Sequence, residues 1–273
     1  MSFSDYVSNL MASAPPEIEE FKKLSREEML DIIIKESNEE VDEVGMEKIP
    51  CDKCHGKGVI YSKADDTLWW KTEPCTCSKS RRALDYVDRM GLTELVRAST
   101  FDRFIADNDF TKTIKSKVTD YLKASDEWLY LGGQSGCGKT HLAMAVFGQL
   151  VKRQKAPRIM LWIQDSQRIK SLVTDEAEYD KAVRPLQTAD YLIIDDFFNC
   201  VPTQADIKLA RTIIDYRYTN KLPTIITSEL LLPELNDYDD AICGRIVERC
   251  GNFCIQIGQD MNKNYRMRGI QTL

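Results

Sequence analysis

The chain has 273 residues, of which 43% are hydrophobic, with a formal net charge of −6 and nine cysteines. This length accommodates one full α/β domain plus a small module, and no apolar run approaches the 18 residues of a membrane span. The N-terminus is polar and soon acidic, unlike a secretory signal, so we expect a cytoplasmic protein with no membrane partner. The acidic balance argues against indiscriminate nucleic-acid binding.

The first 50 residues hold most of the negative charge, with 13 acidic and 5 basic residues and therefore about +2 for the remainder. They are predicted to be helical, and Ser25 and Glu28 have the spacing of a capping box. An acidic helical surface suits docking to another protein, although a solvated face without a partner explains the charge equally well. An earlier helix is predicted from apolar residues at i, i+3, i+4, i+7 and i+8, namely Phe3, Tyr6, Val7, Leu10 and Met11.

Two cysteine pairs follow, Cys51 with Cys54 and Cys75 with Cys77, with 20 residues between the pairs. This spacing is close to that of a four-thiolate zinc site. Four thiolates fill the coordination shell, so the metal would be structural, and its binding would contribute on the order of 10–16 kcal/mol to folding. His55 remains open as a replacement for one thiolate, and unliganded thiols remain the simple alternative.

These features predict a domain organisation. We expect a helical, zinc-binding domain over residues 1–80, a linker over residues 81–98 and a larger domain over residues 99–273. The dipeptide Trp69-Trp70 lies between the cysteine pairs. It could stack on the bases of single-stranded DNA, or pack against the metal module.

Apolar, β-branched or aromatic runs alternate with helical patterns through the larger domain. Alternating strands and helices indicate a parallel sheet with helices on both faces. The predicted strands cover residues 128–131, 159–163, 191–194, 224–226 and 253–257, and the predicted helices cover residues 141–153, 165–173, 178–186 and 204–218.

After the first of these strands, residues 133–140 read Gly-Gln-Ser-Gly-Cys-Gly-Lys-Thr. This is the pattern G-x-x-x-x-G-K-[ST] in its strand–turn–helix context. The glycines allow backbone N–H groups to point at a phosphate, and the helix N-terminus adds a favourable potential. We expect Lys139 to reach the β- and γ-phosphates of ATP and the Thr140 hydroxyl to bind Mg²⁺. The predicted nucleotide contacts are Gly133, Gln134, Ser135, Gly136, Cys137, Gly138, Lys139, Thr140 and His141.

The strand 191–194 ends in two carboxylates, Asp195 and Asp196. A buried strand has no reason to finish in adjacent acids unless a cation binds there. Asp195 suits the Mg²⁺ shell, directly or through water, and Asp196 suits orientation or deprotonation of the attacking water. The two motifs together predict an ATPase.

Polar residues also end the next strand, where Thr227, Ser228 and Glu229 are candidates for sensing the γ-phosphate. Ser228 is our candidate nucleotide contact, and an ordinary strand end is nearly as good an explanation. Only 16 residues follow Ile257. Because these are too few for a helical lid, we expect another protomer or a partner to close the cavity.

Three arginines complete the list of candidates. Arg245 and Arg249 are four residues apart and share one helix face, which is explained either by solvation or by one of them reaching the nucleotide of a neighbouring subunit. Arg266, near the C-terminus, is a further cationic candidate for the nucleotide.

Five segments carry a family resemblance: Thr100-Phe101-Asp102-Arg103-Phe104, GGQSGCGKTHLA, YLIIDDFF, IIDYRYTNKLPTIITSEL and GRIVERC. The chain resembles the DnaC/DnaI-type replicative helicase loaders and their relatives, the IstB-like transposition ATPases, which belong to the AAA+ class. The resemblance covers about residues 97–268 well and residues 1–80 more loosely.

The resemblance implies an α/β AAA+ P-loop domain without a C-terminal lid, in a homo-oligomer that binds ATP between subunits. It implies a hexameric replicative helicase and single-stranded DNA as partners, with Arg249 or Arg245 as the arginine finger. Residues 164–186 lie where the family carries an insertion for single-stranded DNA. Asp196 stands where Glu is frequent in the family, which predicts slow hydrolysis, as in a timing switch. Glu229 stands where Asn is frequent, which departs from the family pattern at the sensing position.

Two other functions fit part of the pattern. A helper ATPase of a transposase would share the core motifs, although the zinc module favours a loader. A P-loop kinase for small molecules would need an acceptor pocket and a mobile, arginine-rich lid, for which the chain has little room.

Overall fold

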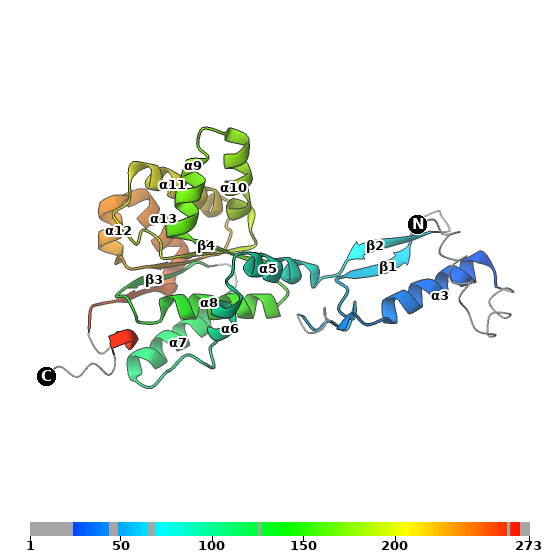
Figure 1. Cartoon of the computed structure of the whole chain (residues 1–273). Helices are drawn as coiled ribbons and strands as arrows, with labels where there is room; N and C mark the ends of the chain where they lie inside the picture. Colours follow the sequence, from blue (N-terminus) through cyan, green and yellow to red (C-terminus); the bar gives the residue numbers. More distant parts are fainter. Residues whose placement is uncertain (1–23, 44–48, 65–68, 125–126, 261–262, 268–273) are drawn as a thin grey trace. The chain divides into compact units, whose positions relative to one another are not determined.

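The computed structural model describes residues 24–43, 49–64, 69–124, 127–260 and 263–267, so the apolar stripe expected at residues 3–11 lies outside the described part. The chain divides into two compact units, Met1–Arg81 and Arg82–Leu273 (Figure 1). The functional boundaries expected after residues 80 and 98 stay predictions; residues of the expected linker form helices α5 (Ser78–Arg89) and α6 (Thr93–Ala98).

The first unit contains helix α3 (Arg26–Glu39) and an antiparallel hairpin of β1 (Val59–Lys63) and β2 (Trp70–Pro74). The predicted capping box begins α3. The Ser25 hydroxyl accepts from the Glu28 N–H at 3.2 Å, and Glu28 accepts from the Ser25 N–H at 2.7 Å.

The Asn38 side chain joins α3 to the hairpin. Its amide donates to the carbonyl of Tyr61 and its oxygen accepts from the Tyr61 N–H, both at 2.9 Å. One amide side chain therefore pairs with the strand as a neighbouring backbone would. Lys63 at the end of β1 also pairs with Asp31 at 2.9 Å, so helix and hairpin form one module.

The second unit contains a five-stranded parallel sheet with the order β4-β5-β6-β3-β7. This confirms the predicted α/β fold. The three middle strands are buried along their whole length, which explains their continuous apolar runs. The strands are β3 (Leu129–Gly133), β4 (Pro157–Leu161), β5 (Tyr191–Asp195), β6 (Thr224–Ser228) and β7 (Cys254–Ile257).

Helices cover both faces of this sheet (Figure 1). On one face lie α7 (Asp109–Tyr121) and α8 (Lys139–Lys152), and α6 contacts α8. The other face carries α9 (Trp162–Ser171), α10 (Glu176–Thr188), α11 (Gln204–Thr219), α12 (Leu232–Tyr238) and α13 (Asp240–Cys250). Among the described residues, no helix is long and apolar enough to cross a bilayer.

The second predicted strand was placed two residues too far along the chain. The strand ends at Leu161, and Trp162 begins α9. The Asp165 carboxylate accepts a hydrogen bond of 2.9 Å from the Leu161 N–H, which starts the helix, and the Trp162 ring packs edge-on against Phe197 at 4.8 Å between ring centroids. These contacts override the β-propensity of the aromatic side chain.

A fully buried arginine, Arg217, lies in α11. Burial lowers its pKa to about 10, so the side chain is charged at neutral pH. Its guanidinium donates hydrogen bonds to the end of α10 and to the start of β6, and so connects the two elements. The acceptors are the carbonyls of Leu186, Gln187, Ala189 and Pro223 and the hydroxyl of Thr224.

Candidate functional site: a phosphate-binding loop and a cysteine cluster

The loop between β3 and α8 requires glycine at two points. Gly138 precedes α8 with φ 94°, and a Cβ there would come within 2.7 Å of the Phe104 ring. Gly133 has φ 115°, and a Cβ there would meet the Ile257 carbonyl oxygen at 2.0 Å. Only glycine fits both the positive φ and the close approach, so Gly133 and Gly138 are required for the conformation of this loop.

The ammonium group of Lys139 is held by the loop itself. It donates to the carbonyls of Gly133 at 2.7 Å and Gln134 at 2.8 Å, and the residue is 5% exposed. A flexible side chain of this kind can exchange these carbonyls for the oxygens of a phosphate. The ammonium therefore lies within the loop that would hold the phosphate.

The two sequence motifs meet at Thr140 and Asp195. The Thr140 hydroxyl donates to Asp195 Oδ1 at 3.0 Å, and the Thr227 hydroxyl donates to the same oxygen at 2.6 Å. Burial raises the pKa of the Asp195 carboxyl, against the lowering effect of the hydroxyls. A hydroxyl and a carboxylate side by side are ligands that Mg²⁺ takes beside nucleotide phosphates, so the residues fit this ion.

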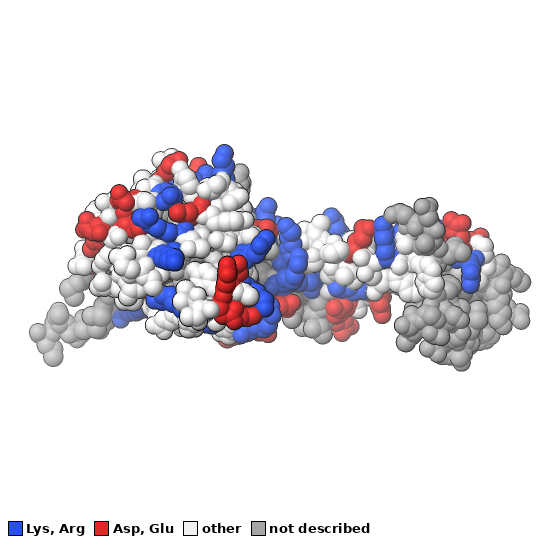
Figure 2. Space-filling view, turned by 90° about the horizontal axis from the view of Figure 1, so that it is seen from above, with Lys and Arg blue, Asp and Glu red and all other residues white. Residues whose placement is uncertain are grey.

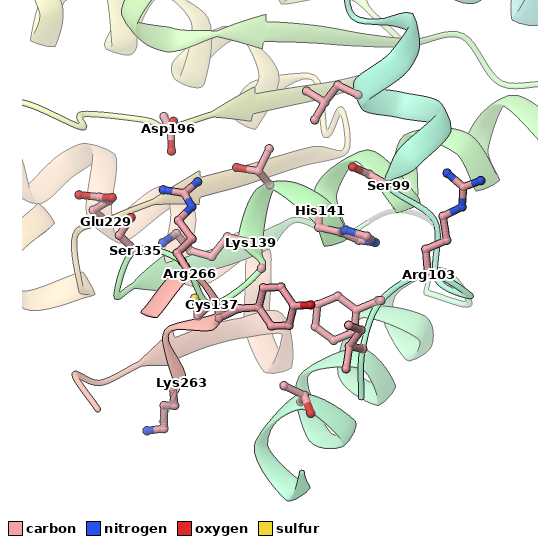
Figure 3. A pocket seen from close by; sticks show the side chains of 18 of the residues that line it. Ser99, Arg103, Ser135, Cys137, Lys139, His141, Asp196, Glu229, Lys263 and Arg266 are labelled. Carbon is pink, nitrogen blue, oxygen red and sulfur yellow. The ribbon is translucent and has the colours of Figure 1, made fainter. Parts of the chain in front are cut away.

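Asp196 lies in a left-handed turn with φ 57° and points into the cavity (Figure 3). Burial raises the pKa of its carboxyl, as does the negative charge of Glu229, while the positive charges of Lys139 and Arg266 lower it. A carboxylate in this position can orient or deprotonate a water next to a bound phosphate.

A cavity of about 460 Å³ opens between these groups. Carboxylates and the Arg266 guanidinium gather at one end, while His141 and Arg103 lie toward the other (Figure 3). The His141 ring approaches the Thr100 carbonyl at 2.8 Å, so it holds the segment 100–104 against the loop. Apolar parts of the wall come from Leu95, Phe104, Ile105 and Tyr265.

The chain's own C-terminal segment forms another part of the wall. The Tyr265 N–H donates to the Gly136 carbonyl at 2.9 Å, and Lys263 and Arg266 line the cavity. Closure of the cavity by another protomer or a partner, expected from the sequence, stays a prediction. Residues 263–266 of this chain cover part of the loop through a long-range contact that the sequence pattern did not indicate.

Other candidates lie away from the cavity. The Ser228 hydroxyl donates to the Phe197 carbonyl at 2.6 Å. Of its two neighbours, Thr227 contacts Asp195 and Glu229 lines the cavity. Arg245 pairs with Asp215 at 3.3 Å. Neither Arg245 nor Arg249 belongs to the cavity wall as described. Sequence reasoning missed Asn199 and Tyr265 in that wall, and Arg103 was noted only within the family motif.

The four predicted cysteines come together in the first unit. Their sulfurs lie within 4.8 Å of one another, with Cys51 and Cys75 at 3.7 Å and Cys54 and Cys77 at 3.5 Å. Zinc–thiolate bonds of about 2.3 Å in a tetrahedron place sulfurs about 3.8 Å apart, so the cluster fits zinc. His55 is not a member of this group, which favours four thiolates over the substitution that the sequence left open.

Two hydrogen-bond donors from neighbouring residues contact sulfur atoms of the cluster. The Gly58 N–H donates to Cys54 Sγ at 3.2 Å, and Arg81 Nε donates to Cys77 Sγ at 3.4 Å. Donors aimed at sulfur stabilise thiolates and are common around such metal sites. The cluster therefore has the ligand set and the surrounding donors of a structural zinc site.

Comparison with known proteins identifies the family to which the second unit is similar. Residues 95–247 match the family model described as the bacterial DnaA ATPase domain. The chain belongs to this family. It is also similar to the phage-like element PBSX protein XkdC of Bacillus subtilis (strain 168), with 27% identity over 236 residues, covering 81% of this chain and 87% of XkdC.

Two solved structures share the fold of this DnaA-type domain. A DnaC helicase loader superposes with a TM-score of 0.50 at 20% identity, covering 60% of this chain and 98% of that one. The replication initiator DnaA bound to AMPPCP and single-stranded DNA gives a TM-score of 0.51 at 18% identity, covering 61% of this chain and 51% of that one. The AAA+ fold is thereby confirmed, and the resemblance to replicative helicase loaders is confirmed at the level of the fold.

Proposed function

We propose that the chain is an ATP-dependent loader of a hexameric replicative helicase onto single-stranded DNA. The observation that carries the proposal is the contact between Thr140 and Asp195 next to Lys139, because it brings the two sequence motifs of a nucleotide site together beside the cavity that Lys139 and Thr140 line. The shared fold with a helicase loader across almost all of that chain supports the loader function.

The chemistry assigned to the site is slow ATP hydrolysis. Lys139 would bind the β- and γ-phosphates, and Thr140 and Asp195 would hold Mg²⁺, which would neutralise charge on the phosphate oxygens. Asp196 accepts a proton from the attacking water or orients it. A DnaA structure of the same fold binds AMPPCP, an analogue of ATP, which supports ATP as the nucleotide.

The arginine finger is proposed to act between subunits. Arg245 and Arg249 lie in α13, outside the cavity of their own chain, so a role at a nucleotide requires a second protomer. We therefore expect a homo-oligomer in the ATP-bound state. Arg249→Ala is expected to leave ATP binding by one protomer intact while lowering hydrolysis by the assembly by roughly tenfold or more.

Single-stranded DNA is proposed to contact α9 and α10, where the family carries its insertion. Arg168, Lys170, Lys181 and Arg184 supply cations there, and the DnaA structure of the same fold binds single-stranded DNA. Basic and acidic side chains are interspersed on the face of the second unit seen in Figure 2. Contact with DNA phosphates would therefore be local and sensitive to salt.

The zinc-binding unit is proposed to dock on the helicase. Its helix α3 carries acidic residues in its first turn, Glu27 and Glu28, and zinc would hold the hairpin to which that helix is bound. A compact, metal-stabilised module of this kind presents a rigid surface to a partner.

The decisive experiment mixes the full chain with the hexameric replicative helicase of the same organism and follows the mixture by size-exclusion chromatography, with and without ATP. We expect one complex whose amount depends on the nucleotide, and hydrolysis that changes when single-stranded DNA is added. Absence of co-migration in every nucleotide state would contradict the loader function. Hydrolysis that requires a small phosphate acceptor would instead indicate a kinase.

A further inference from the structure

Thr227 contacts both Asp195 and Asp196, although it does not line the cavity itself. Its side chain is fully buried at the end of β6. The hydroxyl donates to Asp195 Oδ1 at 2.6 Å and accepts from the Asp196 N–H at 2.9 Å. A hydroxyl has one donor and two acceptor positions, so one Thr227 oxygen serves both residues at once.

These bonds continue the sheet beyond its last backbone pair. The register between β5 and β6 ends at Ile194 and Ile226, and the next position of β6 is Thr227. Its carbonyl accepts from the Phe197 N–H at 2.8 Å. The chain after β5 is thus fastened to Thr227 at three consecutive residues, Asp195, Asp196 and Phe197.

The segment fastened in this way is strained. Asp196 and Phe198 have φ of 57° and 52°, a region that side chains with a Cβ rarely adopt. Such conformations persist only where surrounding contacts impose them, and they concentrate at functional sites. The left-handed turn at Asp196 sends consecutive carboxylates to different places, Asp195 to Thr140 and Asp196 into the cavity.

We infer that Thr227 is a positioning residue for ATP hydrolysis, whose hydroxyl fixes the metal-binding carboxylate of Asp195 relative to the water-activating carboxylate of Asp196. The inference rests on the proposed ATPase function and deepens it. Thr227 is fully buried and does not line the cavity in which a nucleotide would bind. Its loss therefore affects the chemical step, which depends on small displacements, and leaves phosphate binding to the loop and Lys139.

The test compares Thr227→Val, which keeps the shape and removes the hydroxyl, with Thr227→Ser, which keeps the hydroxyl. Thr224→Val is the matched control, because Thr224 is an equally buried threonine at the opposite end of β6. Single-turnover ATP hydrolysis and the affinity for ATP with Mg²⁺ are measured for each. Thr227→Ala replaces the valine variant should the latter fail to fold.

We expect Thr227→Val to hydrolyse ATP about 10- to 100-fold more slowly, as for a misplaced catalytic group, with the ATP dissociation constant within about threefold of the original. Thr227→Ser restores the rate, and Thr224→Val hydrolyses normally. Full activity of Thr227→Val, or a loss of activity in Thr227→Ser as large as that in Thr227→Val, would overturn this inference but leave the proposed ATPase function intact. An original chain that binds ATP without hydrolysing it would overturn the ATPase function as well.

Discussion

The Thr140 hydroxyl donates a hydrogen bond of 3.0 Å to Asp195, a residue 55 positions further along the chain. This bond joins the first turn of α8 to the end of β5, so the two strongest sequence motifs form a single site. The cavity beside it contains the groups that bind a triphosphate and a cation in nucleoside triphosphatases.

Replacing Lys139 tests whether this site binds a nucleotide. We expect Lys139→Ala to lower the affinity for ATP with Mg²⁺ by roughly tenfold or more, about 1.4 kcal/mol per factor of ten, because a buried ammonium no longer reaches the phosphates. Calorimetric titration measures the change. Lys152→Ala at the exposed other end of the same helix is the control. Equal affinity of Lys139→Ala and the unaltered chain would rule out the proposed phosphate contact.

The cysteine cluster predicts one bound zinc per chain, measured by elemental analysis of the purified protein. Cys54→Ser should lose the metal and make the first unit sensitive to proteolysis, since metal binding supplies much of the folding free energy of so small a module. Cys200→Ser, at an exposed thiol outside the cluster, should retain both the metal and the resistance. Full zinc content in Cys54→Ser would argue against these ligands.

Arg217 is expected to be among the most sensitive positions of the core. Arg217→Met removes the buried guanidinium that donates to four carbonyls and one hydroxyl, which should lower the free energy of unfolding by about 3–5 kcal/mol. Urea unfolding measures the loss. The exposed Arg184 provides a control, because Arg184→Met should change stability by no more than about 0.5 kcal/mol.

Asp206 predicts a defined dependence of stability on pH. Burial would raise its pKa, but hydrogen bonds from Lys170 and Thr203 lower the pKa below its ordinary value of 3.8. Because the folded state binds the proton less tightly than the unfolded chain, the stabilisation is present above the ordinary pKa and is lost as pH falls through the folded one.

Asp206→Asn should therefore reduce the loss of unfolding free energy between pH 7 and pH 3, by at most about 1 kcal/mol because pH 3 lies only just below the ordinary pKa. Urea titrations of both proteins at the two pH values provide the comparison. Asp175→Asn, at the exposed cap of α10, is a control for removing a single carboxylate. Parallel pH profiles for Asp206→Asn and the original chain would show that the contacts with Lys170 and Thr203 do not stabilise the ionised form.

Local motifs were predictable because their chemistry requires particular residues at fixed spacing. The phosphate loop needs glycine at positions 133 and 138 and lysine at position 139. The four-cysteine site was recognisable from two closely spaced pairs of cysteines. Strand 159–163 was placed imprecisely, because the packing of Trp162 against Phe197 decides where β4 ends. An aromatic side chain in sequence does not reveal its partner 35 positions away.

The amino-acid sequence by itself determined the alternating α/β pattern, the two nucleotide motifs and the thiolate set, since each follows from short-range periodicity or from residues that one chemistry demands. Only the tertiary structure decided that Lys263, Tyr265 and Arg266 line the cavity. It also decided that Ser228 bonds to Phe197 while Thr227 contacts Asp195 and Asp196, and that Arg217 is buried among carbonyls. These are contacts between segments far apart in the chain, and they depend on how β5, β6 and the C-terminal segment meet, which spacing along a sequence does not encode.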